Sequence, residues 1–215
     1  MSGIYMFEYT ITGRGGHSSR PDQCVNPLMA AAAIVSAFGS VVPSSLDPSD
    51  MGVAAPCIIQ GGTAKNIIPE QCRIGGSGRF LLEESHLKME CSLTRLAKSI
   101  GEGYGCAVEK TYGDQPGSGA PAVVNDPVLS EMAEKAIQKI APQAFEGPQP
   151  PWMASESFGE YCLRFPCVFA FLGIANPKEG YGAPHHNQHF DFNESVLHLG
   201  VEATVQFAVD FLSAK

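Results

Sequence analysis

The chain has 215 residues, of which 44% are hydrophobic, so it is long enough to bury the core of one large domain or of two smaller ones. Its 14 basic and 22 acidic residues leave a net charge of −8 with no basic cluster, so we expect no nucleic-acid partner and no binding to an anionic membrane surface. Seven scattered cysteines without a Cys-x-x-Cys pair indicate reduced residues of a cytoplasmic protein.

The first predicted elements in chain order are a strand and a helix. Residues 4–13 are rich in β-branched and aromatic side chains, which predicts a strand. After a glycine-rich loop, Asn26 and Pro27 suit the N-cap and the first position of an alanine-rich helix that should run to about residue 42. The apolar run 28–42 within it is too short and too interrupted to span a bilayer, so we expect no membrane partner.

Three more strands and a second helix complete this region. The predicted strands cover residues 52–60, 71–81 and 106–113, and the helix covers residues 83–104. The order β-α-β-β-α-β is that of a ferredoxin-like unit, a two-layer sandwich in which two helices cover one face of four antiparallel strands. We therefore predict an α/β fold that begins with this sandwich.

The composition of the sequence changes at residues 114–126, which are rich in Pro, Gly and Ala and lack periodicity. We predict a linker there, between a first domain of residues 4–113 and a second region of residues 127–215. Apolar residues at helical spacing predict a helix over residues 129–140 in the second region.

The remaining predicted elements of the second region include a mostly apolar helix. We expect a helix over residues 155–164, a fully buried strand over 167–175 and a last helix over about 194–213. The last helix carries one polar stripe at i, i+4 spacing and is otherwise mostly apolar; the stripe consists of His198, Glu202, Gln206 and Asp210. Helices of this kind are buried on most sides, and the second region offers few elements to bury it.

Three histidines lie close together in "YGAPHHNQHFDF", residues 181–192: His185, His186 and His189. The cluster suggests a metal site, although histidines in such a loop can equally occupy a solvated turn. Zinc needs roughly four ligands, or three and an open position, which this loop does not supply by itself. The further ligands would have to come from elsewhere.

Seven motifs in a fixed order point to a family. In chain order they are "GRGGHSSRPDQCVNPL", "GGTAKNIIPEQC", "GSGRF", "VVNDP", "MASESFGEY", "FAFLGIAN" and "HHNQHFDFNE". This succession resembles the lid and the C-terminal portion of the metal-dependent amidohydrolases of the aminoacylase and carboxypeptidase superfamily. The branch that it most resembles contains hippurate hydrolases and amidohydrolases of N-acyl and indole-acetyl amino acids. The resemblance covers nearly the whole chain from Ile4 onward.

The resemblance implies an architecture as well as a function. Residues 4–113 correspond to a lid that forms homodimers, and residues 127–215 correspond to the C-terminal part of an α/β catalytic domain. The part of the family that precedes the lid carries most metal ligands and the glutamate general base. We therefore expect an N-terminal catalytic half to be missing from this chain, and the chain to be inactive alone.

The resemblance also assigns candidate site residues. It implies that His186 is a metal ligand, and that His185 and His189 are its neighbours. The metal would be zinc, manganese, nickel or cobalt, and a single ligand does not hold it firmly. Gln188 stands where the family motif "HNPxFDF" has proline, so the loop should be less rigid.

The other candidates lie in the lid and in "MASESF". His17 should reach across the dimer and stabilise the substrate carbonyl as negative charge develops on it. Asn66 and Arg79 should bind the α-carboxylate of the substrate, since a guanidinium binds a carboxylate with two hydrogen bonds. Glu156 should support the metal site from the second shell, with Ser157 in place of a second acid.

These expectations support a hydrolase of the amide bond in N-acyl amino acids or small peptides. Two alternatives remain open. The chain could be a non-catalytic, lid-mediated dimer or a module that binds carboxylates. It could also be one subunit of a split hydrolase, whose metal-binding half is a separate chain.

Overall fold

The computed structural model describes residues 1–114 and 118–214. Residues 115–117, which fall in the expected linker, and residue 215 lie outside the described residues. The chain divides into two compact units. The sheet unit comprises Met1–Val123 and Pro151–Leu163, and the helical unit comprises Val124–Pro150 and Arg164–Lys215. Residues 151–163 thus pack with the first unit; the division into domains at residues 114–126 stays a prediction.

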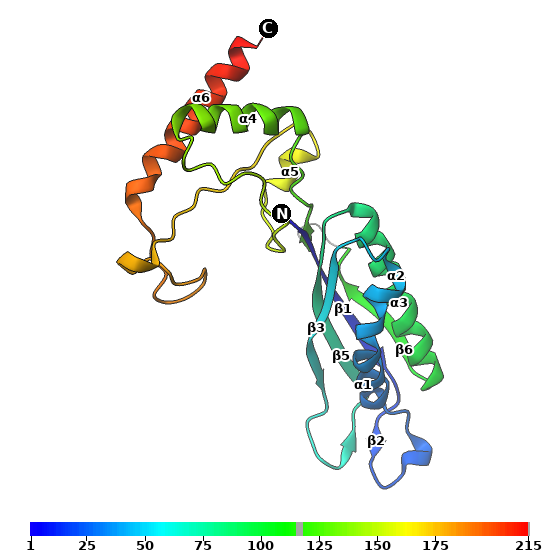
Figure 1. The fold of residues 1–215 in the computed structure, drawn as a ribbon. Coiled ribbons are helices and arrows are strands. Elements are labelled where there is room, and N and C mark those ends of the chain that lie inside the picture. Colours follow the sequence, from blue (N-terminus) through cyan, green and yellow to red (C-terminus); the bar gives the residue numbers. More distant parts are fainter. Residues whose placement is uncertain (115–117, 215) are drawn as a thin grey trace. The chain divides into compact units, whose positions relative to one another are not determined.

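The sheet unit is built on four long antiparallel strands. They are β1 (Gly3–Thr12), β3 (Gly52–Gly61), β5 (Gln71–Phe80) and β6 (Ala107–Tyr112), in the spatial order β3-β5-β1-β6, and the short β7 (Gly119–Ala120) also pairs with β1. Helices α1 (Pro27–Ala37) and α3 (Glu83–Gly103) lie along one face of this sheet (Figure 1). The predicted α/β fold and its β-α-β-β-α-β order are confirmed.

The core lies between this face and the two helices. Alternate residues of β1 point inward, which is the period-2 pattern of a strand with one buried face. The largest fully buried side chains come from all layers: Phe7, Tyr9 and Ile11 of β1, Ile34 of α1, Ile74 of β5, and Met89 and Leu93 of α3. The opposite face of the sheet is polar, with Arg73 donating to Glu8 at 3.0 Å and to Gln60 at 2.8 Å.

The first helix begins as predicted but ends early. The Asn26 side chain accepts the Leu28 backbone N–H at 3.0 Å, which confirms the cap. The helix was expected to run to about residue 42, but α1 ends at Ala37 and continues as a 3₁₀ turn, Phe38–Ser40, and the short α2, Val41–Ser45. The reason is Pro43, which has no N–H to donate to residue 39 and whose ring crowds the preceding turn.

The helical unit confirms two predicted helices. Helix α4 (Pro127–Ile140) begins at Asp126, whose side chain accepts the Leu129 N–H at 2.9 Å. Helix α6 (Leu197–Ser213) follows a 3₁₀ turn, Glu194–Val196, and packs against α4. A further 3₁₀ turn covers Pro177–Glu179.

Two expected elements are corrected. The helix over residues 155–164 is wrong except for α5 (Gly159–Cys162), because Ser155 is hydrogen-bonded to Arg79 and the backbone before residue 157 is not helical. The strand over residues 167–175 is also wrong. This segment forms no strand, because no other strand lies beside it among the described residues of the helical unit. Phe171 is 52% exposed and Leu172 is 39% exposed, so the segment is not buried either.

Helix α6 leaves an apolar face open. Its residues Gln206 and Asp210, two members of the predicted polar stripe, are joined to each other and, through Asp210, to Lys139 of α4. Exposed apolar side chains recur at intervals of three or four residues on the remaining surface, and we call these the α6 stripe: Leu197, Val201, Val205, Val209 and Leu212.

By length and composition alone, two helical stretches could cross a membrane, Pro27–Ser45 and Glu194–Ser213. The first contributes Ala30, Ala31 and Ile34 to the core of the sheet unit, and core helices of soluble proteins pass the same test. The second is α6 with its preceding turn. This is weak evidence for a membrane, and the expected absence of a membrane partner stays a prediction.

Candidate functional site

The structure brings two of the predicted site residues together. The short strands β2 (Gly16–His17) and β4 (Ile67–Ile68) form a two-stranded ribbon at one end of the sheet unit (Figure 1). In this ribbon His17 lies opposite Ile67, and the Ser18 N–H donates to the Asn66 carbonyl oxygen at 3.0 Å. Two loops that are far apart in the sequence therefore place His17 and Asn66 side by side.

The ribbon requires glycine before His17. A Cβ atom added at Gly15 would lie 2.9 Å from the Ile68 carbonyl oxygen, a distance that real Cβ atoms do not show. The glycine-rich "GRGG" therefore permits the close approach of the two backbones. It does not by itself indicate a ligand.

His17 is exposed, and one of its ring nitrogens is occupied. Its Nδ1 lies 2.8 Å from the Ser19 hydroxyl oxygen and accepts the Ser19 backbone N–H at 3.2 Å. A turn closed by the Arg20 N–H and the His17 carbonyl, at 2.9 Å, holds this arrangement. Ser19 was missed in the sequence; the signal that could have found it is a hydroxyl residue two positions after the histidine.

Asn66 presents its amide to solvent. Its side chain is exposed and has no hydrogen-bond partner within residues 1–114 and 118–214. A free amide N–H₂ can donate to a carboxylate oxygen, which is the role predicted for Asn66. That role stays a prediction.

Arg79 lies at the other end of the sheet. In the register of β1 and β5 it stands opposite Ile4, whereas His17 follows β1 beyond Thr12. Eight residues of strand separate Ile4 from Thr12, which amounts to about 26 Å. One copy of the chain therefore does not assemble Asn66 and Arg79 into a single carboxylate site.

Arg79 instead contacts the segment that carries Glu156. Its Nη1 donates to the Ser155 hydroxyl at 2.7 Å, and the Ser2 N–H donates to the carbonyl oxygens of Trp152 and Ala154 at 3.0 and 3.1 Å. These bonds hold the first part of residues 151–163 in the sheet unit. Arg79 and Glu156 are thereby close in the structure although they are far apart in the sequence.

Ser157 takes part in holding Glu156. The Glu156 Oε1 accepts the Ser157 backbone N–H at 2.7 Å and its hydroxyl at 2.9 Å. Hydrogen bonds from Ser157 lower the pKa of the Glu156 carboxyl, because they favour its charged form. The residue that replaces the second acid of the family motif therefore favours the charged form of Glu156, while the predicted second-shell role of Glu156 stays untested.

His186 has an unusual backbone. Its φ is 63°, and it is the one non-glycine residue with positive φ among the described residues. This region costs a non-glycine residue about 1–3 kcal/mol, although histidine is among the residues that tolerate it best. Such a position is one where a functional constraint is a reasonable hypothesis. His185 packs edge-on against Phe190 at 5.2 Å between ring centroids, as a neighbour would.

The described residues do not contain a metal site. No three His, Cys, Asp or Glu side chains within residues 1–114 and 118–214 are grouped so that they could hold a metal ion. His186 is therefore a candidate ligand without companions in this part of the chain. The residues present do not fit the metal centre that the resemblance implies.

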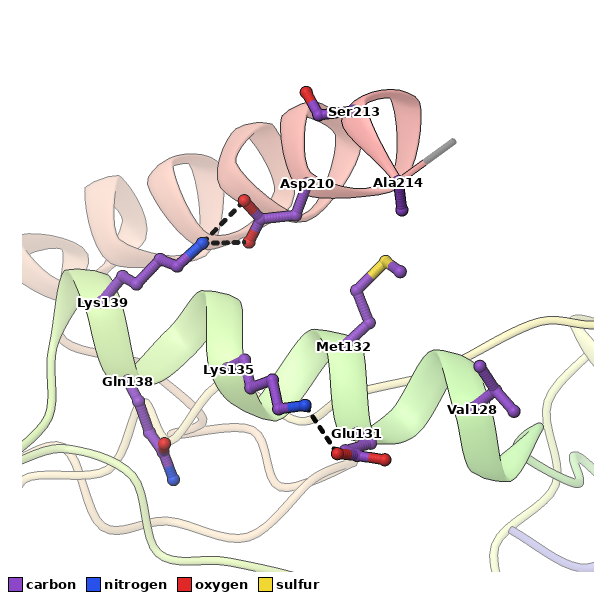
Figure 2. A pocket seen from close by; sticks show the side chains of 9 residues that line it. All are labelled: Val128, Glu131, Met132, Lys135, Gln138, Lys139, Asp210, Ser213 and Ala214. Carbon is purple, nitrogen blue, oxygen red and sulfur yellow. Dashed lines mark hydrogen bonds and ion pairs between the residues drawn. The ribbon is translucent and has the colours of Figure 1, made fainter.

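The helical unit has an open groove between α4 and α6, shown in Figure 2, with a volume of 690 Å³. Lys139 and Asp210 meet across it at 2.7 and 2.8 Å, and Lys135 meets Glu131 along α4 at 2.6 Å. The hydrogen bond from Lys139 lowers the pKa of the Asp210 carboxyl. None of the predicted site residues lines this groove, which is open to solvent, so water screens its ion pairs.

Comparison with known proteins identifies the sheet unit. Residues 1–104 match the M20 peptidase dimerisation domain. This part of the chain is similar to a peptidase dimerisation domain. This domain contains the whole β-α-β-β-α part of the sheet unit, together with His17, Asn66 and Arg79. The resemblance that the seven motifs suggested is thereby confirmed.

The relatives extend over the helical unit as well. The chain is 28% identical to thermostable carboxypeptidase 2 of Saccharolobus solfataricus, over 95% of this chain and 51% of that protein. It is 31% identical to an N-acetyldiaminopimelate deacetylase of Leuconostoc citreum, over 96% and 51%. It is 29% identical to an IAA-amino acid hydrolase, ILR1-like 2, of Arabidopsis thaliana, over 100% and 48%.

A solved structure is similar over nearly the whole chain. A proposed aminohydrolase from methicillin-resistant Staphylococcus aureus superposes with a TM-score of 0.82 and 29% identity, over 97% of this chain and 51% of that chain. The chain thus spans about half the length of the relatives that it matches, and the dimerisation domain occupies its first part.

Proposed function

We propose that this chain is the dimerisation domain and C-terminal portion of an enzyme that hydrolyses the amide bond of N-acyl amino acids or small peptides. The printed activities of the relatives, a carboxypeptidase, a deacetylase and an amino acid hydrolase, support this reaction class. The single observation in the structure that carries the proposal is the pairing of β2 with β4, which brings the backbones of two exposed polar residues, His17 and Asn66, next to each other in the region that matches the dimerisation domain.

The chemistry of these two groups suits an N-acyl amino acid. Attack on the amide carbonyl places negative charge on its oxygen, and a neutral imidazole N–H is a hydrogen-bond donor to that oxygen. The Asn66 amide is a donor to the free carboxylate of the same substrate. We propose these roles, with Arg79 as a positioning residue for the Glu156 segment within one copy of the chain.

We propose that the complete enzyme uses a divalent metal, zinc, manganese, nickel or cobalt, and that His186 is one of its ligands. When bound, such an ion supplies an activated water and polarises a carbonyl. Because the described residues place no other ligands beside His186, the remaining ligands and the general base would belong to an N-terminal half of the enzyme.

We propose that two copies associate through the side of the sheet unit formed by α1 and β3. Neither element contains an Asp, Glu, Lys or Arg, whereas α3 on the other side is rich in them. Interface cores are depleted of charge in this way. β3 is also an edge strand without a protecting charge, and it exposes Val53, Ile58 and Ile59.

The helical unit supports association with a further polypeptide. Its 167–175 segment has no regular secondary structure and no strand partner among the described residues, and the α6 stripe is exposed. Contiguous apolar patches of this kind are uncommon on soluble monomers. We propose that the N-terminal half, in the same polypeptide or as a separate subunit, pairs with 167–175 and covers the stripe. A cytoplasmic location, with neither nucleic-acid nor membrane partner, completes the proposal.

Activity tests this proposal. The purified chain, supplied with zinc, manganese, nickel or cobalt, is expected to hydrolyse hippurate at least about 1,000-fold more slowly than a complete relative, because a general base alone contributes about 10²–10⁴. Release of the free amino acid is the measurement. Metal-dependent turnover by the chain alone, lost in His186→Ala, would contradict the expectation.

The second arm of that test completes the enzyme by supplying the proposed N-terminal half. The segment encoded upstream of Met1, or beside the gene, is added to the chain, and turnover should appear. In the restored enzyme His17→Ala should lower kcat by about 10²–10³, the usual cost of one oxyanion donor. A stable complex without turnover on any N-acyl amino acid would favour the non-catalytic, carboxylate-binding alternative.

The α6 stripe gives a separate prediction. Val205→Asp should weaken binding of the completing segment by about 100-fold, because it buries an unpaired charge in the contact. Val205 is 57% exposed in the single chain, so the variant should fold normally. Calorimetric titration measures the affinity, and Val128→Asp, an exposed valine of α4 outside the stripe, is the matched control. Equal loss of affinity in both variants would count against the stripe.

A further inference from the structure

The contact between Ser19 and His17 determines which nitrogen of the imidazole carries the proton. A backbone N–H can only donate, so the Ser19 N–H at 3.2 Å requires Nδ1 of His17 to accept. A nitrogen that accepts has its lone pair free and is not protonated. In the neutral ring the proton is therefore on Nε2.

The backbone N–H of Ser19, which is the donor to Nδ1, is held in place by hydrogen bonds of both neighbouring residues. The Arg20 N–H closes the turn on the His17 carbonyl at 2.9 Å, and the Ser18 N–H is bound to the Asn66 carbonyl at 3.0 Å. Arg20 is itself anchored, since Nε and Nη2 donate to the two carboxylate oxygens of Asp22 at 3.0 and 2.8 Å. The backbone on either side of Ser19 is thus fixed by bonds that do not involve the imidazole.

The Ser19 hydroxyl adds a second donor to the same nitrogen. Its oxygen lies 2.8 Å from Nδ1, and beside a neutral, accepting nitrogen the hydroxyl donates its proton. Both polar groups of one residue thus favour an unprotonated Nδ1. The distances of 2.8 and 3.2 Å make the hydroxyl the closer of the two.

We infer that Ser19 is a positioning residue, whose hydroxyl and backbone N–H together hold His17 in the tautomer protonated at Nε2. The imidazole then presents one N–H donor on the side away from Ser19. Under the proposed function, on which this consequence rests, that N–H is the group that meets the carbonyl oxygen of the substrate. A histidine in the other tautomer would present a lone pair there and repel the oxygen.

The test reads the tautomer directly on the full chain. Long-range ¹⁵N–¹H spectra of ¹⁵N-histidine-labelled protein distinguish the protonated from the unprotonated ring nitrogen, at about pH 9, where histidine is neutral. His17→Gln assigns the His17 signals. The exposed His198 of α6, whose ring has no partner in the described residues, is the internal reference.

We expect the ratio of the Nε2–H to the Nδ1–H form to be about tenfold higher for His17 than for His198, which is the scale of one or two hydrogen bonds. Ser19→Ala keeps the backbone donor and should lower the His17 ratio about threefold or more, and Ser19→Thr should restore it. A His17 ratio equal to that of His198, or one unchanged by Ser19→Ala, would overturn the inference.

This readout needs neither substrate nor metal, so it is independent of the proposed function. In the completed enzyme, Ser19→Ala should lower kcat only in proportion to the fraction of His17 that leaves the Nε2–H form, a small decrease while that form stays in the majority, so His17→Ala is the variant that tests the catalytic role. A tautomer that responds to Ser19, together with a kcat that is unchanged in His17→Ala, would overturn the role of His17 in catalysis and would leave the positioning by Ser19 established.

Discussion

Ile59→Glu is expected to convert the proposed dimer of this chain into a monomer at micromolar concentration. Ile59 lies on the uncharged edge strand β3 and is 54% exposed in the single chain, so the substitution leaves the fold of the sheet unit intact. In a two-fold symmetric dimer the new carboxylate appears twice, and each copy would be buried without a partner. The dimer should therefore dissociate at least about 100-fold more readily.

Sedimentation equilibrium measures this effect, with Ala107→Glu as the matched control. Ala107 is also exposed on an outer strand, but on β6 at the opposite side of the sheet. This variant should dimerise as the wild type does. A wild-type chain that stays monomeric at high micromolar concentration, or an Ile59→Glu chain that still dimerises, would show that β3 is not the contact.

Gly76→Ala is expected to destabilise the sheet unit by about 3–5 kcal/mol, which combines overpacking with the loss of ladder hydrogen bonds. Gly76 sits between β1 and β3, opposite Phe7 and Pro56. A Cβ atom added there would lie 2.1 Å from the Ala55 carbonyl oxygen and 2.7 Å from the Phe7 ring. A backbone atom cannot move aside as a flexible side chain can, so β3 would have to separate from β5.

Urea unfolding followed by fluorescence measures the loss, because the single tryptophan, Trp152, belongs to the sheet unit. The neighbouring glycine is the control. A Cβ atom at Gly75 would have its nearest contact at 3.5 Å, an ordinary distance, so Gly75→Ala should change stability by less than about 1 kcal/mol. Equal effects of the two substitutions would refute the steric argument.

The elements of the sheet unit were predictable because their signals are local. The alternation in β1, the Asn26 cap and the acidic start of α3 each involve residues within one turn or one strand. Pro43 was a local signal as well, and weighing it would have predicted the end of the first helix near residue 39.

The prediction of a strand over residues 167–175 was wrong because strand formation depends on a partner that is distant in the sequence. The apolar run of this segment is typical of a buried strand, but a strand forms only when another strand supplies hydrogen bonds beside it. That partner is non-local, and the described residues do not contain it. The same holds for the α6 stripe, whose apolar character is evident in the sequence while the surface that should cover it is not.

The sequence by itself determined the α/β fold of the sheet unit, the order of its elements, and the identity of the candidate residues, since caps, periodicity and motifs are properties of neighbouring residues. Tertiary structure decided which candidates meet. It placed Asn66 beside His17 through the pairing of β2 with β4, and it placed Arg79 at the other end of the sheet, beside Ser155. Strand register is set by contacts between distant segments, so no local pattern could show that the predicted carboxylate pair is divided between the two ends of one sheet.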